Sequence, residues 1–281
     1  MRPNENSKKY IGESVFYVYC IAEGDPAKKV LGGSSPAAIE EDSSVRLIEA
    51  SGLAAVVSSV PKPSYGEESL TRNLTDPSWT ALRAMRHEHV VEHFAKRISV
   101  VPLRFGTIYL QAARVEAMLD ENSERLTEIL ERLRFREEWG VNVYSDRVVL
   151  MSSIVSVSPR LKELSERAVQ ASPGEAYLLQ KKIDTLKSEE ARFEVNRAIS
   201  EIEKTLRAES VDAQRLRVLK VESTEHGELK AKFAFLLERS RFQQFQAAAE
   251  KLATELKVSG ISLELTGPWP AYNFAGDLQA V

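Results

Sequence analysis

The stretch DPSWTALRAMRHEHVVEHFAKRISVVPLRFG, residues 76–106, places a helix directly before a strand. Asp76 is a favourable N-cap and Pro77 suits the first helical position, so the sequence predicts a helix from about Pro77 to Arg97. The apolar run 99–106 that follows predicts a strand. A helix followed at once by a strand is the second half of a β-α-β-β-α-β arrangement.

Three apolar runs upstream of that helix supply the first half of the arrangement. The run 14–22 is rich in β-branched and aromatic residues and predicts a strand. The runs 44–50 and 53–60 are separated by a Ser-Gly pair, which indicates a hairpin. A glycine-containing loop and a short helix at 36–42 are expected between the first two strands. We therefore predict a ferredoxin-like α+β domain over residues 1–110.

The second half of the chain repeats this order of elements without repeating its residues. The expected elements are a strand at 141–157, a helix at 175–208, strands at 216–223 and 228–238, a helix at 241–257 and a strand at 261–267. We predict a second ferredoxin-like α+β domain over 139–281, with residues 111–138 as a helical bridge. The helix 175–208 would span roughly 50 Å, and the sequence leaves open whether it packs back or projects.

Two prolines agree with this order of elements. Pro102 falls inside the last expected strand of the first half, and Pro268 falls just beyond the last strand of the second half. Proline has no backbone N–H to donate to a neighbouring strand and is therefore tolerated at the edge of a sheet. Both strands are predicted to lie at sheet edges.

The composition excludes several classes of partner and site. Basic and acidic residues number 38 and 41, for a net charge of −3, which predicts neither a nucleic-acid partner nor a membrane partner. The single cysteine, Cys20, excludes an internal disulfide and a cysteine-cluster metal site. No apolar run approaches the roughly 18 residues that span a bilayer, and the polar N-terminus does not resemble a signal peptide. A cytoplasmic protein is expected.

The histidine-rich segment HEHVVEH, residues 87–93, is the most suggestive chemical motif. His89 and His93 are four residues apart on one helical face, but a zinc site needs at least a third protein ligand. The same face carries arginine and lysine, which would repel a cation, so we predict no metal. His87 lies on the opposite, apolar face and is expected to be a half-buried structural histidine.

Two further segments supply candidate partner-binding residues rather than catalytic ones. Arg104 and Phe105 come from the VPLRFG segment, where the arginine either protects an edge strand or anchors an acidic partner group. Trp269, Tyr272 and Phe274 come from the tail GPWPAYNF, which either seals the protein's own core or contacts a partner. The sequence contains no convincing acid–base pair, nucleophile motif or cofactor motif, so we predict no cofactor and no enzymatic activity.

Three separated motifs carry a resemblance to a known family. YVYCIAEG at 17–24, VPLRFGTIY at 101–109 and LTGPWPAYNF at 265–274 occur in an order that resembles the GvpF/GvpL family of gas vesicle proteins. The resemblance implies a non-enzymatic accessory or minor structural protein that takes part in gas vesicle assembly in the cytoplasm. It also implies that the partners are the main hydrophobic shell protein and other accessory proteins, and that the fold is a two-domain α+β design.

A second interpretation stays open at this point. A ferredoxin-like domain can also serve as a metal-binding or small-molecule-binding protein, either as an enzyme or as a regulatory module. In that case His89 and His93 would need a third ligand from elsewhere in the chain.

Overall fold

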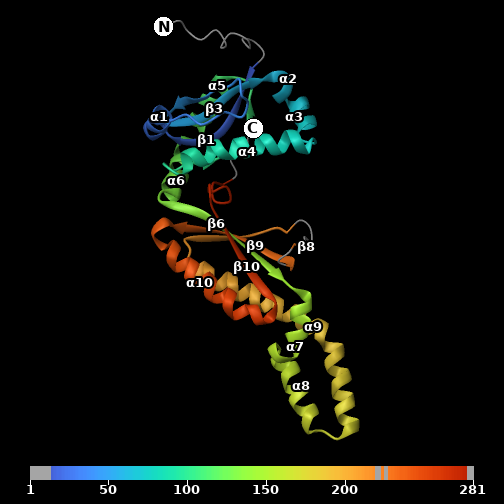
Figure 1. Ribbon diagram of the computed structural model, residues 1–281. Helices are drawn as coiled ribbons and strands as arrows, with labels where there is room; N and C mark the ends of the chain where they lie inside the picture. Colours follow the sequence, from blue (N-terminus) through green and yellow to red (C-terminus); the bar gives the residue numbers. More distant parts are fainter. Residues whose placement is uncertain (1–13, 219–222, 225–226, 277–281) are drawn as a thin grey trace. The chain divides into compact units, whose positions relative to one another are not determined.

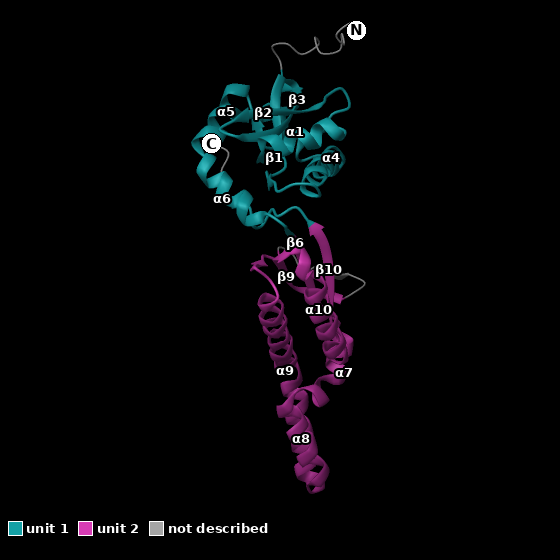
Figure 2. Ribbon diagram, turned by 90° about the vertical axis from the view of Figure 1, so that its left-hand side faces the viewer, with its two compact units in different colours: residues 1–137, 269–281 teal, residues 138–268 magenta. Residues whose placement is uncertain are grey.

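The computed structural model describes residues 14–218, 223–224 and 227–276. The chain forms two compact units, and each is built on an antiparallel sheet. Unit 1 comprises residues 1–137 and 269–281, and unit 2 comprises residues 138–268 (Figure 2). The C-terminal segment therefore belongs to the same unit as the N-terminal sheet.

The sheet of unit 1 has the strand order β2-β3-β1-β4, and β5 also pairs with β1. Its strands are β1 (Ser14–Glu23), β2 (Val45–Ala50), β3 (Leu53–Pro61), β4 (Val101–Pro102) and β5 (Ile108–Tyr109). The central strands β1 and β3 are antiparallel, with Val18 opposite Val57. The expected hairpin joins β2 to β3 through Ser51 and Gly52, which both have positive φ.

Helices cover both faces of this sheet. They are α1 (Gly24–Gly33), α2 (Lys62–Tyr65), α3 (Glu67–Asn73), α4 (Pro77–Ala95), α5 (Ala112–Glu121) and α6 (Ser123–Leu133). Tyr17 and Tyr19 of β1 belong to one hydrophobic cluster with Phe94 of α4. Val18 points to the opposite face and belongs to a second cluster with Leu119 of α5. Unit 1 is therefore a layered structure with the sheet in the middle.

Unit 2 has a sheet with the strand order β10-β6-β9-β7, and β8 pairs with β9. Its strands are β6 (Arg136–Ser145), β7 (Asp212–Leu216), β8 (Ser223–Thr224), β9 (Gly227–Glu238) and β10 (Ile261–Trp269). Its helices are α7 (Arg147–Val157), α8 (Pro159–Gln170), α9 (Pro173–Ala208) and α10 (Phe242–Leu256), with short 3₁₀ helices at Arg239–Arg241 and Lys257–Ser259.

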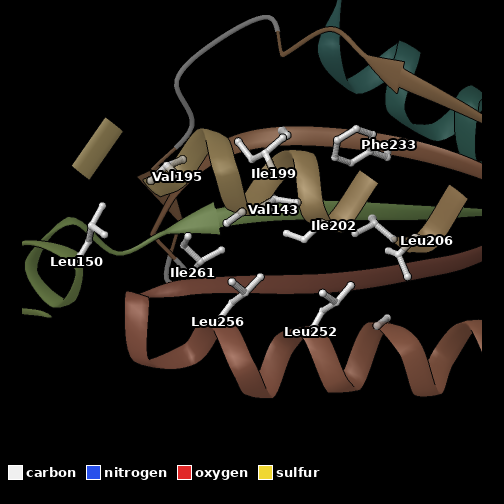
Figure 3. Packing of buried hydrophobic residues seen from close by; sticks show 14 of the residues in the cluster. Val143, Leu150, Val195, Ile199, Ile202, Leu206, Phe233, Leu252, Leu256 and Ile261 are labelled. Carbon is white, nitrogen blue, oxygen red and sulfur yellow. The ribbon is translucent and has the colours of Figure 1, made fainter. Parts of the chain in front are cut away.

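The 36-residue helix α9 has two different surroundings. In its C-terminal half, Ile202 and Leu206 belong to one hydrophobic cluster with Leu252 and Leu256 of α10 and with the sheet (Figure 3). The N-terminal half pairs with α8 as a helical hairpin that extends away from the sheet (Figures 1 and 2). The helix therefore packs on the sheet over one half and projects over the other.

The region 141–157, expected as one long strand or a broken pair of strands, is the clearest difference from the sequence prediction. The strand β6 ends at Ser145, and α7 begins immediately afterwards. The Asp146 carboxylate caps this helix by accepting hydrogen bonds from the backbone N–H groups of Val148 and Val149, at 2.8 and 3.1 Å. A run of valines had favoured strand by propensity, but the cap and the packing of α7 decide for a helix.

Three smaller predictions also need correction, and a fourth lies partly outside the described residues. Residues 24–33 form α1 instead of a loop, and the helix expected at 36–42 is not formed. The strand expected at 99–106 is reduced to β4, because the chain turns at Gly106, which has a φ of +88°. The strand expected at 216–223 lies partly outside the described residues, and β7 ends at Leu216.

The structure also divides the chain differently from the expected boundaries 1–110, 111–138 and 139–281. The helices α5 and α6 pack on the second face of the unit 1 sheet, so residues 111–133 are part of that unit rather than a bridge. The tail from Trp269 onward returns to unit 1 as well. The two edge-strand predictions are confirmed, because β4 and β10 each lie at one end of their sheet.

Candidate functional site

His87 is the central residue of a group of polar and aromatic side chains in unit 1. The group includes two of the candidate residues, Phe105 and Tyr272. His87 is on α4, where Asp76 starts the helix by accepting hydrogen bonds from Ser78 N at 2.9 Å and Trp79 N at 3.3 Å. The ring is only 3% exposed. It was expected to be half-buried, and the structure shows that it is buried completely among aromatic side chains.

Both nitrogens of this ring have tyrosine partners. Nδ1 is 2.9 Å from the Tyr17 hydroxyl and Nε2 is 3.1 Å from the Tyr272 hydroxyl. Tyr17 comes from β1 and Tyr272 from the C-terminal tail, 185 positions away from His87. The ring of Phe105 stands edge-on to the imidazole at a centroid distance of 5.8 Å. Phe105 and Tyr272, two of the five candidate residues, are therefore neighbours of the same histidine.

The hydrogen bonds around His87 have one consistent direction. The Tyr272 hydroxyl donates a hydrogen bond to Glu88 Oε2 at 2.9 Å, so it accepts a hydrogen bond from the N–H group at His87 Nε2. Nδ1 is then unprotonated and accepts a hydrogen bond from the Tyr17 hydroxyl. Tyr17 in turn accepts the backbone N–H of Gly106 at 3.0 Å. This series of hydrogen bonds connects the turn after β4 to β1, to α4 and then to the C-terminal tail.

Burial determines the protonation states in this group. It lowers the pKa of His87 to about 4, and the nearby Leu103 backbone, which favours the charged ring, offsets only part of that effect. It also raises the pKa of both Tyr17 and Tyr272. The pKa of Glu88 is raised by burial as well, although the Tyr272 hydroxyl lowers it in part. At neutral pH the imidazole and both phenols are uncharged, which suits a structural connection rather than proton transfer with solvent.

The C-terminal tail is held in unit 1 by apolar contacts as well. Phe274 is 1% exposed, and Ala275 belongs to the hydrophobic cluster that includes α5 and α6. Tyr272 packs against the cluster on the other face. Trp269 differs, with 44% of its surface exposed. Tyr272 and Phe274 therefore seal the protein's own core, as one of the two interpretations of the tail predicted.

The remaining candidates have different surroundings. Arg104 is exposed in the turn after β4, where its carbonyl accepts a hydrogen bond from Thr107 N. Its role in partner binding, like that of Trp269, stays a prediction. The thiol of Cys20 is buried in β1, and burial raises its pKa, so it is not a reactive nucleophile.

The two histidines considered as metal ligands are His93, which lies near a backbone carbonyl, and His89, which is exposed. His93 Nε2 is 3.1 Å from the carbonyl oxygen of Ser34. Within the described ranges 14–218, 223–224 and 227–276, no group of three or more His, Cys, Asp and Glu side chains is arranged to hold a metal ion. In the same part of the chain, no helix is long and apolar enough to cross a membrane.

Sequence reasoning missed Tyr17 and Glu88 as members of this group. The signal that could have identified Tyr17 is its alternation with Tyr19, which places both phenols on the face of β1 that meets α4. Glu88 carried no comparable signal, because its partner Tyr272 is 184 positions away.

The fold defines the class to which this chain belongs, a mixed α/β protein with two antiparallel sheets. The same fold occurs in the crystal structure of the gas vesicle protein GvpF from Anabaena sp. PCC7120, at a TM-score of 0.63 and 17% identity over 94% of this chain and 97% of that one. The crystal structure of GvpF from Microcystis aeruginosa matches at a TM-score of 0.60 and 15% identity, over 94% of this chain and 99% of the other.

The family follows from the sequence comparison. Residues 15–276 match the model of the gas vesicle synthesis protein GvpL/GvpF family, and the chain belongs to that family. Gas vesicle protein L of Streptomyces sp. (strain CB03234) is 29% identical over 82% of this chain and 83% of its own length. Gas vesicle protein L1 of Halobacterium salinarum is 24% identical over 93% of this chain and 90% of its own length. The resemblance that the three motifs indicated is confirmed.

Proposed function

We propose that this chain takes part in gas vesicle assembly by binding the main hydrophobic shell protein and other accessory proteins, and that it is not an enzyme. Its family membership and the names of its relatives support a role in gas vesicles. The structural observation that carries the binding proposal is the edge strand β10. It lies at the end of the strand order, so among the described residues one side of it has no neighbouring strand.

The strand β10 is the most suitable of the sheet edges for this purpose. It has nine residues, whereas β2 has six, β7 has five and β4 has two. Its single charged residue, Glu264, accepts hydrogen bonds from Asn142 and Tyr144 at 3.0 and 2.7 Å. By contrast β2 and β7 each carry an acidic and a basic residue, and charges on an edge discourage pairing with another chain.

An edge strand of this kind binds an extended segment by adding it to the sheet. Main-chain hydrogen bonds provide the affinity, and alternate side chains provide the specificity. Pro268 lacks a backbone N–H, so the pairing segment of β10 is Ile261–Gly267. A hydrophobic shell subunit that is held in this way would be kept from pairing with other copies of itself until it enters the shell.

Co-expression of this chain with the main shell protein, followed by affinity pull-down, tests the proposal. Ser262 is exposed on β10, and Ser262→Lys places a charge on the edge, so the recovered shell protein should fall several-fold. Ser200→Lys, at an exposed serine of α9, is the matched control and should leave recovery unchanged. Equal recovery with both variants would contradict binding through β10, and no recovery with the unmodified chain would contradict shell-protein binding itself.

We also infer that each unit is related to the ferredoxin-like fold. The sheet orders support this, because the four strands on the main path of each sheet, without the short strands β5 and β8, follow the order second-third-first-fourth in both units. That is the order of a split β-α-β arrangement, in which an antiparallel strand separates the two parallel ones.

The location proposed for the chain is the gas vesicle. Flotation of intact vesicles from a producing cell separates bound from unbound protein. The chain should rise with the vesicles and leave them only after washing or collapse of the shell. Its complete absence from the floating layer at every stage of assembly would contradict a stable association.

A further inference from the structure

Unit 2 contains a surface groove that the proposed shell-protein contact does not use. It has a volume of about 530 Å³ and lies between α7, the middle of α9 and the start of β9. Leu150 and Met151 of α7 and Ala191 and Val195 of α9 form its apolar floor. Leu150 and Val195 appear at the same end of the hydrophobic cluster in Figure 3.

The rim of the groove carries an excess of positive charge. Arg147, Arg192, Lys230 and Glu228 are its charged residues, so the balance is three positive against one negative. Lys230 Nζ pairs with Glu228 Oε1 at 2.6 Å, which neutralises that pair. Arg147 and Arg192 are exposed, and neither guanidinium has an ion pair or hydrogen bond with another residue in the described part of the chain.

Other basic side chains of this chain form ion pairs, for example Arg83 with Glu40 and Arg160 with Glu190. Arg147 and Arg192 instead lie beside an apolar floor, with exposed side chains that a partner can reach. Arginine is suited to binding carboxylates through paired N–H donors.

We propose that this groove docks an acidic, leucine-containing segment of a partner protein. Aliphatic side chains of the segment lie on the floor formed by α7 and α9, and its carboxylates pair with Arg147 and Arg192. The groove volume falls within the range of roughly 300–1,000 Å³ that is typical of ligand pockets. It therefore accommodates a few side chains of a segment and not a folded domain.

Fluorescence anisotropy with the purified full chain tests this proposal independently of shell-protein binding. The probe is a short fluorescein-labelled peptide built from leucine and glutamate, and the comparison peptide has lysine in place of every glutamate. The acidic peptide should bind, more weakly as salt is raised, and the basic peptide should not. Arg147→Glu and Arg192→Glu should each weaken binding about ten-fold. Arg167→Glu, at an exposed arginine of α8 outside the groove, should not.

A second measurement places the peptide on the protein. The native cysteine is buried, so Ser188→Cys on the groove wall provides an accessible thiol there. Ser200→Cys, an exposed position on α9 outside the groove, is the matched control. A bromoacetyl version of the acidic peptide should alkylate the first variant at least five-fold faster. Equal alkylation of both variants, equal binding by all three arginine variants, or no binding of the acidic peptide would overturn the proposal.

Discussion

The two sheets have the same strand order but are covered differently. In unit 1 hydrophobic residues gather on both faces, with Tyr17 on one side of β1 and Val18 on the other. In unit 2 the cluster lies on the face that meets α9 and α10. On the opposite face, Asn142 and Tyr144 donate hydrogen bonds to Glu264. The same arrangement of strands therefore supports a sheet with a hydrophobic cluster on each face, and a sheet whose second face carries a hydrogen-bonded polar group.

The difference shows where each unit places its additional helices. Unit 1 uses α5 and α6, followed later by the C-terminal tail, to cover the second face of its sheet. Unit 2 has α7 and α8 before its long helix, and α8 pairs with the N-terminal half of α9 as the helical hairpin that extends away from the sheet. The sheet is the part that the two units share. The additional helices cover the second face of the sheet in unit 1 and form a projecting helical hairpin in unit 2.

The largest expected effect tests the closure of unit 1 by the tail. Phe274→Ala removes a buried ring, and we expect the free energy of unfolding to fall by about 3–5 kcal/mol. Trp269→Ala, at the exposed aromatic of the same tail, should cost less than about 1 kcal/mol. Chemical denaturation followed by circular dichroism measures both values. Equal losses would show that the tail is not anchored through its buried ring.

The hydrogen-bonded histidine should make the stability of unit 1 depend on pH. The pKa of His87 is about 4 in the folded protein and about 6.5 in an unfolded chain. Between these values the unfolded state binds the extra proton. The stabilisation is therefore complete above pH 6.5 and is lost as the pH falls towards 4, by about 3 kcal/mol in total. Between pH 7 and pH 5 the loss should reach about 2 kcal/mol.

Comparison with His87→Gln isolates this contribution. The variant removes the titrating ring, so its free energy of unfolding should depend less on pH over the same interval. Glu88 acts in the opposite direction, because its raised pKa gives stability that is lost as the pH rises through that value. Glu88→Gln should therefore make the loss on acidification larger. If the free energies of unfolding of His87→Gln and of the unmodified chain changed with pH in parallel, His87 would not be the source of the pH dependence.

Local signals in the sequence were sufficient for much of the fold. Asp76 and Pro77 identified the start of α4, and the expected end at Arg97 is two residues beyond Ala95. The face of His87 was also predicted correctly, because helical periodicity alone separates it from His89. Asp146 is as good an N-cap as Asp76. The valine-rich segment after it has the composition of a strand, so composition favours a strand at the place where the cap starts a helix.

The candidate site depended on information that local signals do not carry. The contact between His87 and Tyr272 joins positions 185 residues apart, and nothing in either segment indicates the other. The return of the tail to unit 1 could not be derived from its proline and aromatic content, which fits a core or an interface equally well. Long-range packing, rather than propensity, decided between them.

The stability of the helical hairpin formed by α8 and α9 should depend on one buried carboxylate. Glu190 of α9 accepts hydrogen bonds from Ser158 Oγ at 2.7 Å and Arg160 Nη1 at 2.9 Å, which joins the start of α8 to α9. Glu190→Ala leaves the buried hydroxyl without this partner and should cost about 1–3 kcal/mol. Glu189→Ala, at the exposed neighbouring position, should cost less than about 0.5 kcal/mol. Thermal unfolding of the two variants gives the difference, and equal melting temperatures would contradict this role.

The smallest expected effect compares one equivalent feature in the two units. Asp76 caps α4 in unit 1 and Asp146 caps α7 in unit 2, each by accepting two backbone N–H groups. Asp76→Ala and Asp146→Ala should each lower the free energy of unfolding by about 1 kcal/mol. Tryptophan fluorescence can assign the loss, because Trp79 and Trp269 belong to unit 1 and Trp139 to unit 2.

Substitution by asparagine distinguishes a cap from a charge effect at these two positions. Asparagine caps helices about as well as aspartate, so Asp76→Asn and Asp146→Asn should retain most of the stability that the alanine variants lose. If asparagine costs as much as alanine at one position, the charge of that aspartate, acting on the helix N-terminus, is the larger contribution there. The two units would then differ in what stabilises the start of these helices, even though both helices have the same type of N-cap residue.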